Sequence, residues 1–263
     1  MSAWVAAARA QAHCPPRVPR LPLFVAGKAV GSVEDEVLNE ISLQPLQDVR
    51  WTLSKQEYAW HLEGAGDATP ALNALAHALR AAGRCGPWRD EQLAVRSTTG
   101  ERVGTIERGA VRPLGIATLA VHLVGWTADG RMWVQQRAFD KANNPGQWDT
   151  LMGGMVSAAD SLEQALARET WEEAGLHVQA LRGVRHGGHV DFAQPSDEAH
   201  GCGYMVERIH WYSATVPDGV EPCNQDGEVE RFECIARAEL EARLAQGAFT
   251  PEAALILAMA LGW

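Results

Sequence analysis

The chain has 263 residues, of which 46% are apolar and 21% charged. A chain of this length can bury one large core or two modest ones, and its composition excludes a disordered or fibrous protein. The 33 acidic residues outnumber the 23 basic ones and give a formal net charge of −10, which argues against a general nucleic-acid groove because such a groove needs a basic surface.

The sequence predicts neither a membrane span nor a secretion signal. Its longest apolar stretches, residues 115–126 and 253–263, are too short to cross a bilayer. The alanine-rich start, residues 1–12, has no basic leading segment and is interrupted by Arg9 and Gln11, so it reads as a helical or frayed terminus. Five cysteines without a CxxC pair are typical of free thiols in a reducing compartment, and we expect a cytoplasmic protein.

Residues 1–112 are expected to form a smaller α+β domain ahead of the main one. A helix is predicted to begin at Thr69-Pro70, because proline is favoured at the first helical position, and to end before Gly83. Arg112-Pro113 marks the expected boundary with a second domain at residues 113–263. The strands expected before that boundary are two short ones within residues 21–33 and a hairpin of residues 93–96 and 102–107.

The second domain is expected to contain strands interleaved with two well-separated helices. The stronger helix begins at Ser161, which forms a capping box with Gln164, and ends at Gly175, where glycine tolerates a left-handed conformation. This order of elements predicts an α/β/α sandwich with a mixed sheet, and therefore an α+β fold overall. The other expected elements are strands at residues 114–126, 131–137, 203–216 and 229–235, a last helix at 250–261, and a loop around His186, His189, His200 and Cys202 that fits no zinc pattern.

Three glutamates of the predicted helix share one face. Glu169, Glu172 and Glu173 stand at positions i, i+3 and i+4, where three like charges destabilise a bare helix. A hard divalent cation, Mg²⁺ or Mn²⁺, neutralises such a cluster through oxygen ligands. Gly153-Gly154 lies just before the helix and lets a backbone carbonyl approach the ion, while Arg168 can hold a neighbouring carboxylate. The alternative interpretation is a solvated acidic face.

The segment that contains these glutamates resembles the Nudix box. In that family the box implies hydrolysis of a nucleoside diphosphate, or of another organic diphosphate, linked to a further group. Asp160, Ala159 and Thr170 depart from the usual residues of the box, but the metal ligands match. The resemblance rests on Gly154, on Asp160 after five residues and on residues 168–176 after seven more; it implies metal binding by Gly153, Glu169, Glu172 and Glu173, catalysis by Glu172 and Glu173, and bracing by Arg168.

Short motifs outside the box resemble one Nudix subgroup, the Nudix part of fungal thiamin pyrophosphokinase fusions. That subgroup has an extra N-terminal domain, and the resemblance implies activity on diphosphates of thiamin and damaged thiamin. The motifs are Trp88-Arg89-Asp90-Glu91, Leu114-Gly115-Ile116 with Val121-His122-Leu123, the loop with Arg137, Lys141, Pro145-Gly146 and Asp149, and Asn224 to Val229 with Phe232.

The expected reaction is a Mg²⁺-dependent cleavage of a small organic diphosphate, thiamin diphosphate or a damaged form among them, to the monophosphate and phosphate. Arg137 and Lys141 are the expected phosphate contacts, and Trp148 is a candidate for stacking on a cationic ring. Glu228 is the candidate general base, with Glu173 as its substitute. Ordinary surface roles are the alternative for Arg137, Lys141 and Glu228.

Other functions stay open at this stage. The substrate can instead be linked to a nucleoside diphosphate, as in ADP-ribose, or the chain can be a Nudix-fold binding module without catalysis. An isomerase on the same fold is disfavoured because no cysteine lies in the loop before Gly153-Gly154. We expect a small-molecule diphosphate as the partner, neither nucleic acid nor membrane, and leave a homodimer open. His122, in an apolar run, is expected to be a core histidine.

Overall fold

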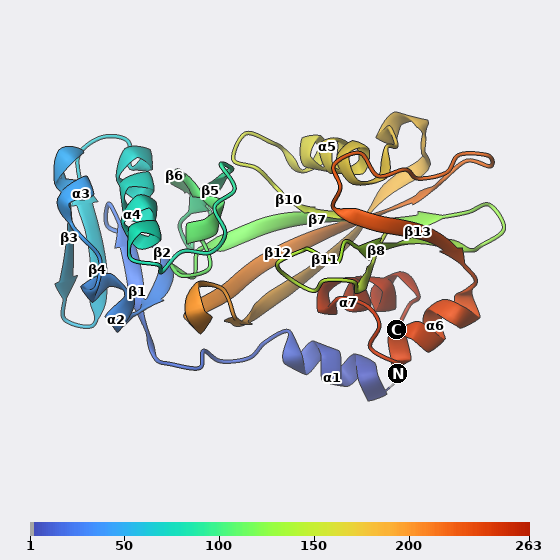
Figure 1. The fold of residues 1–263 in the computed structure, drawn as a ribbon, viewed down its shortest axis with the longest axis horizontal. Helices are drawn as coiled ribbons and strands as arrows, with labels where there is room; N and C mark the ends of the chain where they lie inside the picture. Colours follow the sequence, from blue (N-terminus) through green and yellow to red (C-terminus); the bar gives the residue numbers. More distant parts are fainter. Residues whose placement is uncertain (1–2) are drawn as a thin grey trace.

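The computed structural model describes residues 3–263, so the first two residues of the alanine-rich start lie outside it. Figure 1 shows an elongated molecule with a smaller part at one end and a larger part at the other. Among the described residues no helix has the length and apolar character that crossing a membrane requires.

The smaller part consists of a four-stranded sheet, a long helix and a hairpin. Its elements are β1 (Arg20–Val25), β2 (Lys28–Glu34), α2 (Asp35–Asn39), α3 (Gln44–Asp48), β3 (Trp51–Gln56), β4 (Ala59–Gly64), α4 (Thr69–Ala81), β5 (Gln92–Arg96) and β6 (Arg102–Glu107). The sheet has the order β2-β1-β4-β3. Leu72, Leu75 and Leu79 are fully buried in one apolar cluster with the sheet, because spacings of three and four residues place them on one face of α4. The expected strands, helix and hairpin are confirmed; β3 and β4 were not predicted.

The larger part is a mixed sheet between helices. Its elements are η1 (Arg108–Ala110), β7 (Ala117–Trp126), β8 (Met132–Arg137), β9 (Trp148–Asp149), β10 (Met152–Met155), α5 (Leu162–Ala174), η2 (Val178–Ala180), β11 (Arg182–Ser196), η3 (Ala199–Gly201), β12 (Gly203–Thr215), β13 (Val229–Ile235), α6 (Arg237–Ala245) and α7 (Pro251–Ala260). The sheet has the order β11-β12-β7-β8-β13, and β10 and β9 pair with β7 and β8. Only the β12–β7 pairing is parallel among these described strands.

Side chains of β7 alternate between two apolar clusters on opposite faces of the sheet. Val121 and Leu123 pack with α5, whereas Ala120 and Val124 pack with α6 and α7. Figure 1 shows α5 on one side of the strands and α7 on the other. The predicted α/β/α sandwich with a mixed sheet is therefore confirmed.

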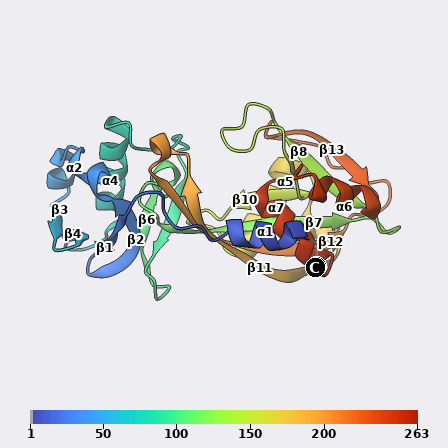
Figure 2. The same ribbon diagram turned by 90° about the horizontal axis from the view of Figure 1, so that it is seen from below.

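Three segments differ from the expectations, and one of them is α6, a helix that was not predicted. The predicted loop around His186 and His189 is most of β11, whose glycines and register shifts hide the strand pattern. Helix α1 (Ala3–Gln11) packs against α7 in the larger part, and both figures show the two helices side by side (Figures 1 and 2). Residues 3–13 therefore contact the larger part, although the expected division places them with the smaller one.

The ends of α5 follow from local sequence. The hydroxyl of Ser161 accepts the backbone N–H of Gln164 at 3.2 Å, and the Gln164 side chain accepts the backbone N–H of Ser161 at 2.8 Å, which confirms the capping box. Gly175 ends the helix with a φ of 63°, the left-handed conformation predicted for it.

We expect Ser161→Ala to lower the free energy of unfolding by about 1 kcal/mol, because it removes the cap acceptor for the first turn of α5. Urea denaturation followed by circular dichroism measures the change. Ser157→Ala is the matched control, since among the described residues that hydroxyl accepts a backbone hydrogen bond only from Ala159, at a long 3.4 Å. An equal free energy for both variants would contradict the capping role.

Candidate active site

Glu173 is the most enclosed of the three glutamates on α5, with 3% of its surface exposed. Its Oε2 accepts hydrogen bonds from the backbone N–H of Gly153 at 2.9 Å and from Nε2 of Gln135 at 2.9 Å. Burial raises the pKa of Glu173 to about 8, because the two donors only partly offset the loss of hydration. A cation beside this carboxylate would stabilise its charged form.

Arg168 connects the other acidic residues of the helix. Its Nη1 donates to Glu169 Oε1 at 2.8 Å and to Glu172 Oε2 at 3.0 Å. Its Nε donates to Asp160 Oδ2 at 3.0 Å, so the shorter aspartate of this box still reaches the guanidinium. Burial raises the pKa of Glu169 to about 7 in spite of this partner. The contacts are those of the brace that the resemblance implies.

The two glycines of β10 provide room for side chains that lie directly on the strand. A Cβ at Gly154 would come within 2.1 Å of the Glu169 carboxyl carbon, and a Cβ at Gly153 within 2.4 Å of the His122 ring. Any other residue at these positions would displace the side chain above it. Gly154 therefore lets Glu169 pack against the backbone of β10.

The carboxylates of Glu169, Glu172 and Glu173 suit a hard divalent cation, but they do not point toward one common position. Within residues 3–263, no three His, Cys, Asp or Glu side chains surround a point that can hold a metal ion. Glu173 is held by Gln135 and by β10, whereas Arg168 holds Glu169 and Glu172. The three carboxylates and the backbone carbonyl of Gly153 are oxygen donors of the kind that such a cation prefers.

An open cavity of about 410 Å³ borders Gly153, Gly154 and Glu169. Basic and acidic side chains line it, and the described lining contains no Phe, Tyr or Trp. Besides Glu169, the charged residues are Arg108, Arg112, Arg137, Lys141, Asp149, Asp197, Glu198, Glu207, Glu228 and Glu252. The cavity thus combines positive groups suited to phosphate with carboxylates suited to a cation.

The expected phosphate contacts lie in this cavity, and each already has a partner. The Arg137 guanidinium lies 3.6 Å from Asp149 Oδ2 and donates to the backbone carbonyl of Asn143. Lys141 forms an ion pair with Glu228. Burial alone would raise the pKa of Glu228, but Lys141 outweighs it and the pKa is lowered. A carboxylate with a lowered pKa is a weak base while this pair persists.

Trp148 does not line the cavity, and its position does not support the expected stacking role. Only 9% of the residue is exposed, and the Arg243 guanidinium lies over its ring at 4.6 Å. Successive residues of a strand point to opposite faces, so Asp149 faces the cavity while Trp148 packs beside α6. Trp148 is therefore near the basic loop in sequence without facing the cavity that the loop lines.

Several residues of the site were not predicted from the sequence. Arg108 lines the cavity and is held by Glu91 at 2.7 Å, a residue of the Trp88–Glu91 motif. Arg112 lines it too and lies 3.6 Å from Glu207. In the sequence, only the Trp88–Glu91 motif pointed to this part of the site, because neither arginine belongs to a recognisable pattern. His122 is buried as expected, bonds Thr150 at 2.9 Å, and also contributes to the cavity wall.

The comparisons with known proteins concern mainly the larger part. Residues 117–255, more than half of the chain, match the NUDIX domain. Nudix hydrolase 24, chloroplastic, of Arabidopsis thaliana is 31% identical over 140 residues, 52% of this chain and 37% of that protein. An isopentenyl-diphosphate Delta-isomerase of Streptomyces coelicolor is 30% identical over 152 residues, 57% of this chain and 74% of that protein. The solved structure of DR0079 from Deinococcus radiodurans has 23% identity and a TM-score of 0.48 over 61% of this chain and 92% of that one.

The matched region includes the site described above. It contains β7, β10 and α5 with all three glutamates, whereas the chain spans less than two fifths of Nudix hydrolase 24. The domain match over more than half of the chain, together with the glutamates on α5 beside Gly153-Gly154, shows that this chain belongs to the Nudix family.

Proposed function

We propose that the chain hydrolyses a small organic diphosphate to the monophosphate and phosphate. The observation that carries this proposal is the cavity in which Glu169 and the glycines of β10 lie beside four basic side chains. Bound Mg²⁺ or Mn²⁺ would neutralise phosphate charge and lower the pKa of a water there. Glu169, Glu172 and Glu173 would hold the ion, and Arg168 would orient the first two.

The basic residues would bind the diphosphate and free the candidate base. Arg108 lies in η1 and Arg112 shortly after it, whereas Arg137 ends β8 and Lys141 lies in the loop that follows β8. A phosphate competes with Glu228 for Lys141, and departure of Lys141 removes the interaction that lowers the Glu228 pKa. Glu228 then becomes a better proton acceptor for the attacking water, and Glu173 is the substitute.

We further propose that the substrate carries a cationic group, as thiamin-type diphosphates do. Carboxylates of Glu198, Glu207 and Glu252 share the cavity with the basic cluster, so the site suits a molecule with a cation and an anion. The described lining has no aromatic side chain for stacking an adenine, which disfavours an ADP-ribose-type substrate. Glu91, from a motif that resembles the thiamin subgroup, positions Arg108 at this cavity.

Isopentenyl diphosphate isomerisation is the second candidate, because two relatives are named isopentenyl-diphosphate Delta-isomerases. The described lining of the cavity contains no cysteine, the residue whose absence before Gly153-Gly154 already disfavoured this reaction. The substrate panel below therefore includes isopentenyl diphosphate.

The test is turnover of thiamin diphosphate, an oxidised thiamin diphosphate, ADP-ribose and isopentenyl diphosphate with Mg²⁺, with products identified by phosphorus NMR and chromatography. We expect kcat/KM for a thiamin-type substrate to exceed that for ADP-ribose by about 10-fold or more. A substrate that leaves charged groups of the site without a partner commonly loses at least this factor. Equal values would contradict the cationic preference. Isomerised isopentenyl diphosphate without hydrolysis of any substrate would contradict the hydrolase proposal.

Lys141→Gln should raise KM for the preferred diphosphate by about 10-fold and change kcat less, because a lost charge-assisted contact to phosphate weakens binding by about 1.5 kcal/mol. Initial rates across substrate concentrations separate the two constants. Lys55→Gln is the control, as Lys55 pairs with Asp35 in the smaller part and lies outside the cavity. An unchanged KM for Lys141→Gln would remove Lys141 from the phosphate site.

A further inference from the structure

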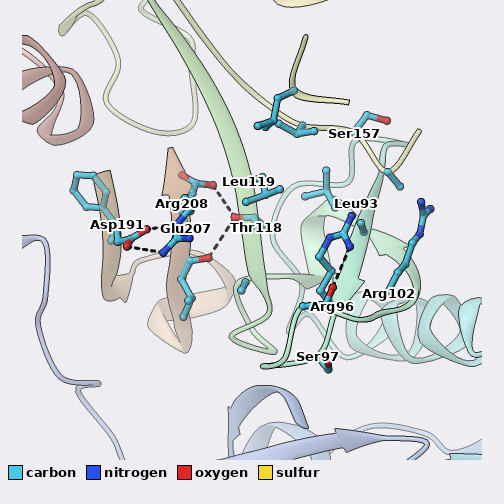
Figure 3. Close-up of a pocket in the computed structure, with 18 of the residues that line it drawn as sticks. Leu93, Arg96, Ser97, Arg102, Thr118, Leu119, Ser157, Asp191, Glu207 and Arg208 are labelled. Carbon is cyan, nitrogen blue, oxygen red and sulfur yellow. Dashed lines mark hydrogen bonds and ion pairs between the residues drawn. The ribbon is translucent and has the colours of Figure 1, made fainter. Parts of the chain in front are cut away.

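A second open cavity, of about 590 Å³, lies apart from the candidate active site (Figure 3). The hairpin β5–β6, the start of β7, strands β11 and β12 and the loop before α5 enclose it, and we call it the hairpin cavity. Its volume falls in the range typical of sites for small organic ligands. The two cavities share only Glu207 among their described lining residues.

Much of the hairpin cavity is apolar. Leu93 of the hairpin, Leu119 of β7 and Val156 before α5 contribute to its walls, together with Leu162 and Val206. Leu93 and Leu119 are labelled in Figure 3. Contact with such walls favours a ligand that has a substantial apolar body.

Two arginines give the cavity unbalanced positive charge. Arg96 and Arg102 are direct partners in the register of the hairpin, where like charges destabilise the pairing. The Arg96 guanidinium donates to the carbonyl of Gly100 at 3.2 Å, and the Arg102 guanidinium forms no hydrogen bond or ion pair with any residue that the structure describes. Glu101, which lies between the strands, is paired with Lys28 at 2.6 Å. An anion between the two guanidinium groups would remove their repulsion.

The acidic residues that line the hairpin cavity are already paired with other groups. Arg208 binds Asp191 through two contacts of 2.7 and 3.0 Å, which Figure 3 shows on the side of the cavity away from the hairpin. Asp160 is held by Arg168 at 3.0 Å. Glu207 accepts a hydrogen bond from Thr118 at 2.8 Å. No acidic group of the described lining therefore neutralises the two hairpin arginines.

We propose that the hairpin cavity binds a small organic anion, with its apolar body against the leucines and its phosphate, sulfonate or carboxylate group between Arg96 and Arg102. A guanidinium donates two parallel hydrogen bonds to such a group, so two of them can bind all of its oxygens. The site is distinct from the diphosphate cavity, and its occupancy requires no turnover.

Binding of 8-anilinonaphthalene-1-sulfonate to the full chain tests the proposal, because this fluorescent probe joins an apolar ring system to an anion. We expect one saturable site, with Kd raised about 10-fold or more in the double variant Arg96→Gln/Arg102→Gln, since each charged hydrogen bond contributes about 1.5 kcal/mol or more. Arg182→Gln/Arg185→Gln is the matched control. Both of its arginines are exposed on β11 and lie outside the cavity, and the change in charge is the same.

A second variant tests the position of the site without removing charge. Ala117 is exposed and lines the cavity, so Ala117→Trp should fill it, weaken probe binding and leave the thermal unfolding midpoint unchanged. Gly154→Ala, at the other cavity, should bind the probe as wild type does. Unchanged Kd in the double arginine variant, or in Ala117→Trp, would overturn the proposal.

Competition identifies the anionic group. Phenyl phosphate, benzenesulfonate and benzoate are titrated against the bound probe, and the one that displaces it best assigns a phosphate, a sulfonate or a carboxylate ligand. Displacement by none of the three would overturn the proposal. Since no reaction is measured, the result stands or fails independently of the proposed hydrolysis.

Discussion

Glu173→Gln is expected to lower kcat for diphosphate hydrolysis by more than about 100-fold. Replacing even an indirect partner of a metal ligand typically costs 10- to 100-fold in activity or affinity, and this variant removes a proposed ligand charge itself. The amide oxygen of glutamine still accepts a hydrogen bond from Gly153 or Gln135, so the fold should persist. Steady-state kinetics and calorimetric titration with Mg²⁺ measure both effects.

Glu163→Gln is the matched control for that variant. Glu163 lies in the first turn of α5, is exposed and contacts Ser161, so its replacement removes the same charge from the same helix. We expect its kcat to stay within about 2-fold of wild type, as for most surface changes. Equal activity of Glu173→Gln and Glu163→Gln would refute the assignment of the metal site.

Gly154→Ala is expected to have the second largest effect, a loss of kcat of about 100-fold with little loss of stability. The new Cβ would lie 2.1 Å from the Glu169 carboxyl carbon, so the carboxylate must move away from β10. Because the end of a glutamate side chain is flexible, this displacement costs little folding energy. A misplaced catalytic group commonly reduces the rate by about this factor.

Kinetics and the thermal unfolding midpoint should be measured together for Gly154→Ala. Gly203→Ala is the control, since this glycine also lies in a strand and its Cβ would come no closer than 3.1 Å to another atom. A fall in the midpoint that matches the fall in activity would mean that the substitution damages the fold. Full activity would mean that Glu169 does not need its place on β10.

Much of the fold was predictable because the signals are local. The capping box of Ser161 and Gln164 and the left-handed Gly175 define α5 within a residue of its observed ends. The alternating apolar pattern likewise predicts β7, β8 and β13. Strand β11 was missed because its glycines and register shifts interrupt that pattern, and its pairing with β12 supplies the stability that its local sequence lacks.

The contents of the site were predictable only in part. Glu169, Glu172 and Glu173 lie within five residues of one helix, so helical periodicity alone places them together. Trp148 and Lys141 both lie shortly before the box in sequence, yet one packs beside α6 and the other lines the cavity. Strand direction and loop path decide between these outcomes, and neither can be read from sequence spacing.

The sequence by itself determined an acidic chain with a Nudix box, a metal-seeking face on one helix and an α/β/α sandwich around it. Tertiary structure decided which distant side chains lie near that face. Glu91 holds Arg108 at the cavity, and Gln135 donates a hydrogen bond to Glu173. Tertiary structure also decided that Arg96 and Arg102 stand opposite each other in the hairpin, where no acidic residue of the cavity lining pairs with them. The physical reason is the distance along the chain over which each signal acts. Helix and strand periodicity act over a few residues, whereas cavities form from distant segments that burial of the core brings together.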